Sequence, residues 1–257
     1  MKQAIKVLSL AVKILWVLVI IFSITAVYSA TNLRVGFGES KTFFSDGIIS
    51  LSIPLFINNT GFYEIADLNI TTYIGSCDNK TVSTSSTLVS TIPPSHNIQK
   101  THNITLDIEN LTRELPHLAF NDSVLDVHTF VALKFANVIP IQISTNATMP
   151  WGAPLYNFFI GEISFEHTQN RLVVPLSFEN HAVFSINGTM RFEVYNSENE
   201  QVSTAEVMID VLPGLGFEDV AEIVVDPSKL THEGQVQVFF ETSAFSIGPI
   251  IESWMIP

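Results

Sequence analysis

The chain has 257 residues, of which 47% are hydrophobic and only 14% are charged. This length suits one large domain or two of ordinary size, each able to bury its own core. Beyond Arg34, 8 basic residues face 25 acidic ones, which gives a net charge of −17. A body that acidic repels phosphate backbones, so nucleic acid is excluded as an expected partner.

The first structural signature is at the N-terminus. Lys2, Lys6 and Lys13 precede 20 uncharged residues that end at Leu33. A helix of this length crosses a bilayer, and the positive-inside rule places its start in the cytoplasm. Residues 1–33 are therefore expected to be a cytoplasmic start and a transmembrane signal anchor, with the rest of the chain extracellular. The residues that mark the membrane segment are Ile14, Trp16, Phe22 and Tyr28.

A cleavable signal peptide is the alternative interpretation of this segment. The run Val27-Tyr28-Ser29 offers small residues at plausible cleavage positions, and signal peptides end in such a pattern. Gly36-Phe-Gly38 is interpreted as a flexible exit from the membrane. Both interpretations export the body, so they differ only in whether the helix is retained.

Asn-x-Ser/Thr triplets support export, because only an exported chain can use them for glycosylation. Seven of the eight precede residue 150, which predicts a more heavily shielded half next to the membrane. The candidate asparagines are Asn58, Asn69, Asn79, Asn103, Asn110, Asn121, Asn146 and Asn187.

Beyond residue 33 the sequence pattern predicts β-strands. Residues 47–57 and 67–74 alternate apolar and polar side chains, and the turn-prone residues 58–61 separate them, which predicts two strands joined by a short connection. With 19 Phe and abundant Val, Ile and Thr, an all-β fold is expected. Further strands are predicted at residues 103–108, 125–135, 172–178, 189–195, 202–211 and 235–244.

Segments in the first half of the chain are also similar to segments in the second half. Residues 53–59 match 174–180 at an offset of 121, and residues 127–130 match 236–239 at an offset of 109. A repeat this long indicates a duplicated domain, since solenoid units have periods of about 20 to 50 residues. We therefore expect two tandem β-sandwiches after the transmembrane helix.

The boundary between the two sandwiches is expected near residues 144–154, where turn and breaker residues interrupt the strand pattern. The predicted domains are residues 34–149 and 150–257, with Trp151 packed at their junction. Pro54 and Pro175 fall inside predicted strands, which predicts an edge position or a bulge for both strands. Such edges either protect the sheet or accept a strand from another molecule.

These patterns resemble a known family. A strand that ends in an apolar-Pro-apolar run and an Asn-rich turn, then Leu68-Asn-Ile-Thr-Thr and Thr91-Ile-Pro-Pro94, is similar to the late-embryogenesis-abundant type 2 domain of water-stress and hypersensitive-response proteins. Asn59-Thr60 and Asn180-His181 replace the family's usual Asn-Pro. The resemblance implies a non-enzymatic, fibronectin-like sandwich, found also in archaeal membrane-anchored proteins.

Motifs that carry chemistry are missing from the sequence. It has no zinc-ligand spacing, no nucleophile elbow and no phosphate-binding loop, so no enzyme activity, metal or cofactor is expected. Cys77 is the only cysteine, which rules out an intramolecular disulfide and leaves a partly buried thiol or a bond to another chain. Residues 213–222 are predicted to form a turn with one short helix.

The expected function is that of a membrane-anchored extracellular protein of the cell envelope, binding or scaffolding other envelope proteins or further copies of itself. The alternative is a secreted filament or surface-layer subunit that assembles by strand donation after cleavage behind Ser29. A lipid-handling role for the sandwich interior would need a continuous apolar groove, which a sequence alone cannot show.

Overall fold

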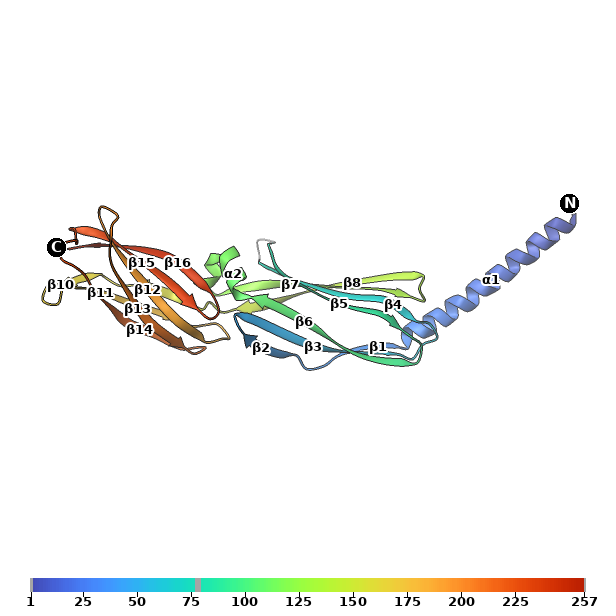
Figure 1. Cartoon of the computed structure of the whole chain (residues 1–257). Coiled ribbons are helices and arrows are strands. Elements are labelled where there is room, and N and C mark those ends of the chain that lie inside the picture. The colour runs from blue at the N-terminus through green and yellow to red at the C-terminus, as the bar shows by residue number, and fades with distance from the viewer. Residues whose placement is uncertain (1, 77–79, 257) are drawn as a thin grey trace.

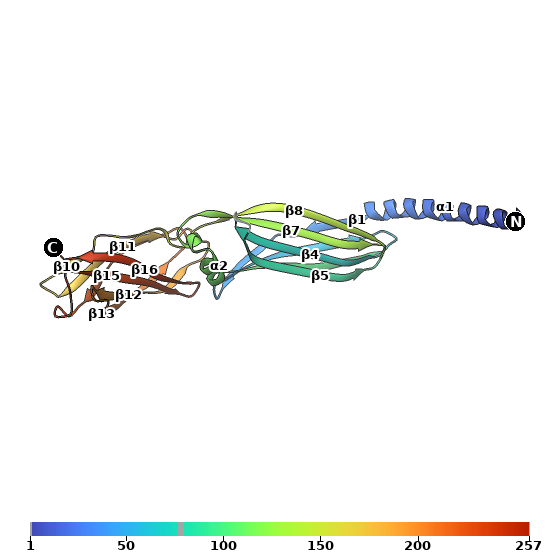
Figure 2. The same cartoon turned by 90° about the horizontal axis from the view of Figure 1, so that it is seen from above.

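The computed structural model describes residues 2–76 and 80–256. Its first element, α1 (Lys2–Thr31), extends from one end of an elongated body of strands. The N-terminus and the C-terminus lie at opposite ends of the molecule, and the strands form two sandwiches placed end to end between them (Figures 1 and 2). This architecture confirms the predicted all-β fold with an N-terminal apolar helix.

The first sandwich consists of two four-stranded antiparallel sheets. One sheet has β3 at its centre, with β6 on one side and β1 and β2 in succession on the other; the second has the order β5-β4-β7-β8. The bounds are β1 Leu33–Phe37, β2 Lys41–Ser45, β3 Ile48–Asn59, β4 Ile65–Ser76, β5 Thr81–Ile92, β6 His96–Asp107, β7 Ser123–Phe135 and β8 Ile139–Trp151.

The second sandwich has the same strand order. In one sheet β11 lies between β14 and the pair β9 and β10, and the other sheet has the order β13-β12-β15-β16. The bounds are β9 Tyr156–Ile160, β10 Ser164–Glu166, β11 Arg171–Glu179, β12 Ile186–Asn196, β13 Gln201–Val211, β14 Gly216–Val224, β15 Glu233–Thr242 and β16 Ser246–Met255. The sequence repeat and the boundary between residues 149 and 150 stay predictions; β8 continues to Trp151.

Alternating burial explains why these segments are strands. Along β11 the side chains of Leu172, Val174, Leu176 and Phe178 are buried while their neighbours are more exposed. Side chains of successive strand residues point to opposite faces, so one face of each sheet supplies the core.

The sequence predicted an edge position or a bulge for the proline-containing strands, and the edge position is wrong. Pro54 lies in β3 and Pro175 in β11, and both strands have neighbours on two sides. Each proline faces a break in the neighbouring strand, where Gly38 N donates to Pro54 O at 2.8 Å and Gly161 N donates to Pro175 O at 2.8 Å. Because the neighbouring strand is broken there, no carbonyl oxygen of that strand loses a hydrogen bond through the missing N–H of proline.

Two local predictions are also wrong. Residues 213 and 214 form the predicted turn, but residues 216–224 form β14 rather than a helix, because every residue from Gly216 to Val224 pairs with β11. Gly36 and Phe37 are not a flexible exit, since both lie in β1 and pair with β3. Cross-strand pairing therefore overrides the local turn composition at both places.

Candidate functional site

The end of α1 is docked on the first sandwich. Ser29 is fully buried, and its hydroxyl oxygen accepts hydrogen bonds from Phe62 N at 2.9 Å and Tyr63 N at 3.2 Å. An ideal Cβ on Gly61 would lie 2.0 Å from the Ser29 hydroxyl oxygen, so this approach requires glycine. The helix end and the loop between β3 and β4 therefore fit closely.

Aromatic side chains extend this contact along the helix. The hydroxyl groups of Tyr63 and Thr25 share a hydrogen bond of 2.7 Å, and the Tyr63 ring lies edge-on to Phe22 with centroids 5.5 Å apart. Tyr28 stacks on Phe62 at 5.1 Å. The loop thus lies beside the last turns of the helix.

The connection from α1 to the sheet is short. Asn32 follows the helix, its carbonyl oxygen accepts from the Thr60 hydroxyl at 2.8 Å, and β1 begins at the next residue. Contacts on both sides of Asn32 leave no free linker between helix and sandwich. We call the group of Ser29, Thr25, Phe62 and Tyr63 the membrane junction.

The residues predicted to mark the membrane segment all lie on α1. Their exposed fractions are 53% for Ile14, 63% for Trp16, 37% for Phe22 and 51% for Tyr28. Over Ile5–Thr31 the helix is long and apolar enough to cross a membrane, and little of the body covers its side chains.

The candidate glycosylation asparagines lie on different elements. Asn103, Asn121, Asn146 and Asn187 are exposed, whereas Asn58, Asn69 and Asn110 are half-buried. Cys77 and Asn79 lie outside the described residues. A glycan can extend from an exposed asparagine without rearrangement of the fold. The exposed Asn103, Asn121, Asn146 and Asn187 are therefore better candidates for glycosylation than the three half-buried asparagines.

A second cluster of contacts joins the two sandwiches. The short helix α2 (Ile108–Glu114) and the turn η1 (Pro116–Ala119) lie at this joint (Figure 1). Leu155 N donates to Ala119 O at 2.8 Å, and the indole N–H of Trp151 donates to Leu118 O at 2.8 Å. One hydrophobic cluster runs through both sandwiches here.

Charged groups complete the joint. Asp122 accepts from Ala153 N at 2.8 Å and from His181 Nδ1 at 2.7 Å, while His181 Nε2 lies 3.1 Å from Glu179 Oε2. The His181 ring also stacks on Tyr156 at 4.1 Å. Because both ring nitrogens face carboxylates, which only accept, the protonated imidazolium satisfies the geometry.

The pKa values at the joint shift accordingly. The hydrogen bond to Asp122 raises the pKa of His181, partial burial opposes this, and the hydrogen bond to Glu179 adds to it. Burial acts to raise the pKa of Asp122, but the hydrogen bonds from Ala153 N and His181 outweigh it and lower the pKa. The pair is therefore charged on both sides over a wider pH range than either residue alone.

A buried histidine crosses the core of the first sandwich. His102 is 3% exposed, and its Nε2 and Nδ1 each lie 2.9 Å from a threonine hydroxyl, of Thr72 and Thr87 respectively. Burial lowers the pKa of His102. This polar layer separates the apolar cluster next to the membrane junction from the cluster at the joint, so we assign it a structural role.

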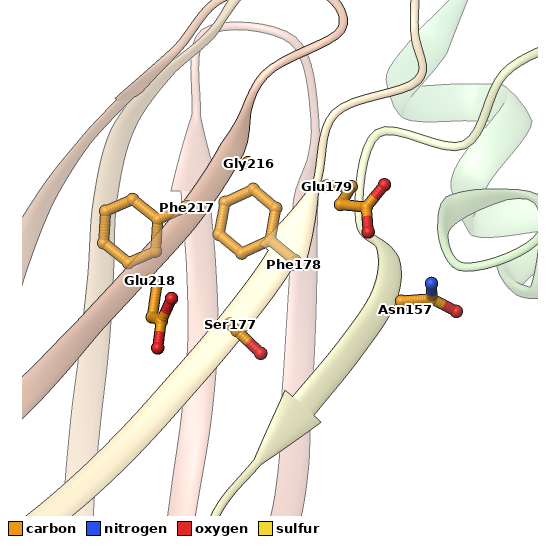
Figure 3. Close-up of a pocket in the computed structure, with 7 residues that line it drawn as sticks. All are labelled: Asn157, Ser177, Phe178, Glu179, Gly216, Phe217 and Glu218. Carbon is orange, nitrogen blue, oxygen red and sulfur yellow. The ribbon is translucent and has the colours of Figure 1, made fainter.

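One pocket lies on the outer sheet surface of the second sandwich. A depression of about 450 Å³ lies over β9, β11 and β14, and the close-up shows Ser177, Glu179, Glu218 and Asn157 around it (Figure 3). Among the hydrogen bonds of the described residues, none joins Ser177 to a histidine, and no group of three His, Cys, Asp or Glu side chains could hold a metal. A serine without such a base is not activated as a nucleophile.

Sequence reasoning found part of these clusters. It placed Trp151 at a junction and predicted the apolar segment up to Leu33, but it considered Ser29 only in the cleavage alternative and not as a docking residue. Phe62, Tyr63, Asp122 and His181 were missed, because these partners lie 33 to 59 positions away in the chain. Only the fold brings such residues together.

Fold and junction together define an all-β chain with one apolar helix docked on its first sandwich. No family model matches the chain, and no curated protein matches it. Several solved structures are similar at low identity. Red sea bream transglutaminase has 12% identity and a TM-score of 0.31, with 88% of this chain covered; this chain spans 31% of that protein's length.

For two further solved structures, the match covers a larger share of the other protein's chain. The periplasmic chaperone SfaE has 10% identity and a TM-score of 0.29, with 87% of this chain and 98% of that chain covered. A bacterial adhesin from Mobiluncus mulieris has 10% identity and a TM-score of 0.30, with 80% of both chains covered. Similarities at this level carry no conclusion about what the present chain does.

Proposed function

We propose that this protein is a membrane-anchored, non-enzymatic surface protein whose two sandwiches bind or scaffold partners outside the cytoplasm. The proposal rests first on the membrane junction. Ser29 is fully buried with two backbone N–H groups donating to it. Cleavage behind Ser29 would remove Ser29, Thr25 and Phe22 and would leave the Phe62 and Tyr63 N–H groups and the Tyr63 ring without these partners, so the junction favours a retained helix.

The charge distribution supports the orientation. Lys2, Lys6 and Lys13 precede the apolar segment, while the body beyond Arg34 carries −17. Basic residues on the flank of a single span favour the cytoplasmic side, so the sandwiches face outward. An acidic exterior also keeps such a body soluble and away from the anionic inner membrane face.

The shape of the molecule supports binding or scaffolding over catalysis. The sandwiches lie end to end and place the C-terminal sandwich far from α1 (Figure 2). A rod of this kind presents its far end and its long sides to other envelope proteins or to further copies of itself. We further propose that both sandwiches are late-embryogenesis-abundant type 2 domains of an archaeal envelope, on the resemblance described above.

Cell fractionation tests the proposal. We expect the protein to stay with membranes after alkaline carbonate washing and its sandwiches to be digested by protease added to intact cells. Digestion that requires opened cells would place the sandwiches inside and contradict the proposed orientation. Recovery in the medium without α1 would instead support the secreted filament or surface-layer subunit.

A further inference from the structure

One end of the first sandwich displays apolar side chains beside α1. Phe62, in the loop that docks on the helix, is 62% exposed, and Val138, in the turn between β7 and β8, is 74% exposed. Tyr28, on which Phe62 stacks, is 51% exposed. We call Tyr28, Phe62 and Val138 the apolar tip. Large exposed apolar side chains gathered at one place mark an interaction surface.

The two loops of the apolar tip lie together. Ala136 N, two residues before Val138, donates to Glu64 O at 3.0 Å, and the rings of Tyr63 and Phe135 meet edge to face at 6.0 Å. The apolar tip is therefore one surface built from two loops and the helix end. It is continuous with the apolar surface of α1 itself.

Helix geometry sets the level of this surface in a bilayer. The hydrocarbon core is about 30 Å thick, which a helix crosses in about 20 residues. If Lys6 is the last residue on the cytoplasmic side, about 20 helical residues place the outer boundary of the hydrocarbon core near residue 26. If it is Lys13, the boundary lies near residue 33. Tyr63 contacts Thr25 and Phe22, so its loop lies level with this boundary or deeper.

The charge at this end permits contact with lipid. The segments 30–35, 58–68, 91–97 and 133–140 meet at this end through strand pairing. Their charged residues are two basic and two acidic, Arg34 and Lys134 against Glu64 and Asp67, so they sum to zero with His96 neutral. Lys134 and Asp67 also pair at 2.9 Å. A neutral end on a body of −17 avoids repulsion from lipid phosphates.

From these observations we infer that the apolar tip inserts into the outer headgroup layer of the membrane that α1 crosses. Phe62 and Val138 enter the boundary between headgroups and acyl chains, where aromatic and aliphatic side chains are favoured. Glu64 limits the depth, because a carboxylate resists transfer into hydrocarbon. The inference rests on the proposed membrane anchoring and adds that the rod is seated on the bilayer rather than held above it.

Quenching of tryptophan fluorescence by lipid tests this. The full chain is reconstituted in phosphatidylcholine vesicles whose acyl chains are brominated near the headgroup end, and in a second set near the middle of the bilayer, where Trp16 lies if the span is counted from Lys6. Native Trp16 reports whether α1 is in the bilayer. In a Trp16→Phe background, Phe62→Trp and Val138→Trp report on the apolar tip, and Met208→Trp, which replaces a side chain that is 77% exposed on the second sandwich, is the control. Buried Trp151 and Trp254 supply a constant background.

We expect brominated lipid to reduce the emission of the tryptophans at positions 62 and 138 roughly twofold, as interfacial aromatic side chains contact the lipid, and to leave position 208 unchanged. Quenching of Trp16 without quenching at positions 62 and 138 would overturn the inference and leave the anchor intact. Absence of quenching at Trp16 would overturn the anchoring and the seating together.

Discussion

Asn59 and Asn180 hold the same position in the two sandwiches. Both are fully buried, and each side-chain amide donates to the carbonyl oxygen four residues later, of Tyr63 at 2.9 Å and of Phe184 at 2.9 Å. Each also donates to the last residue of the neighbouring sheet's outer strand, β5 or β13, and accepts from the backbone N–H two residues later. Each asparagine thereby fixes the loop that follows the proline-containing strand.

Replacement of this amide should be costly. We expect Asn59→Ala to lower the free energy of unfolding by about 2–4 kcal/mol, because buried backbone groups lose their partners. The control is Asn97→Ala, since Asn97 is exposed on β6. Urea unfolding of the full chain in detergent micelles measures both. Equal midpoints for the two variants would show that the buried amide contributes nothing.

The membrane junction can be tested at a single hydroxyl. Ser29→Ala should accelerate hydrogen exchange of the Phe62 and Tyr63 amides by about tenfold, since losing an acceptor in a buried site costs about 1–3 kcal/mol. The matched control is Ser23→Ala, because Ser23 bonds only to Val19 O within α1. Unchanged exchange in the Ser29 variant would mean that the helix end is not docked.

Packing at the joint between the sandwiches gives a third prediction. Phe44 stacks on Phe184 with ring centroids 4.7 Å apart, whereas the neighbouring Phe43 is 56% exposed. We expect Phe44→Ala to cost about 2–3 kcal/mol of stability, as lost ring packing does at partly buried sites, and Phe43→Ala to cost little. Thermal unfolding compares the two. A larger loss of stability in Phe43→Ala than in Phe44→Ala would contradict the prediction, because it would mean that Phe43 rather than Phe44 packs at the joint.

The joint should also respond to pH. The pKa of His181 is raised by its hydrogen bond to Asp122, so its stabilising contribution is fully present below the unfolded pKa of about 6.5 and is lost as pH rises through the folded pKa. His181→Phe keeps a ring over Tyr156 and removes the titration. We therefore expect the difference in Tm between wild type and this variant to shrink from about pH 6 to about pH 8.

His102 must be separated from this effect. Its pKa is lowered by burial, so its protonation in the unfolded state destabilises the fold as pH falls below about 6.5. This effect of His102 on stability changes with pH in the opposite direction to the effect of His181. It is the same in wild type and in His181→Phe, so it cancels in the difference between their Tm values. A Tm difference that is flat or grows with pH would contradict the assigned ion pair.

Alternating strands were the part of the fold that local sequence predicts well. The segments predicted at residues 47–57 and 172–178 fall within or next to β3 and β11, because one side of each strand is buried and the period-two pattern is plain. Short or exposed strands such as β2 and β8 lack that pattern. Their pairing is decided by partners far along the chain, which a local window does not contain.

The candidate site was less predictable for the same reason. Position 29 stood out by its small side chain alone, and the two N–H groups that bond it belong to a loop 33 and 34 residues later. The edge prediction for Pro54 failed because the neighbouring strand is broken opposite the proline, which lets an interior strand carry it. Neither relation has a signature in consecutive residues.

The retained helix is the centre of this account, and one measurement tests it directly. Intact mass and N-terminal sequencing would be applied to the native protein from membrane and medium fractions after deglycosylation. We predict a membrane-bound chain that still begins at Met1 or Lys2 and retains α1. A chain that begins near Ala30 in shed or polymeric material would contradict the anchor and favour the secreted subunit.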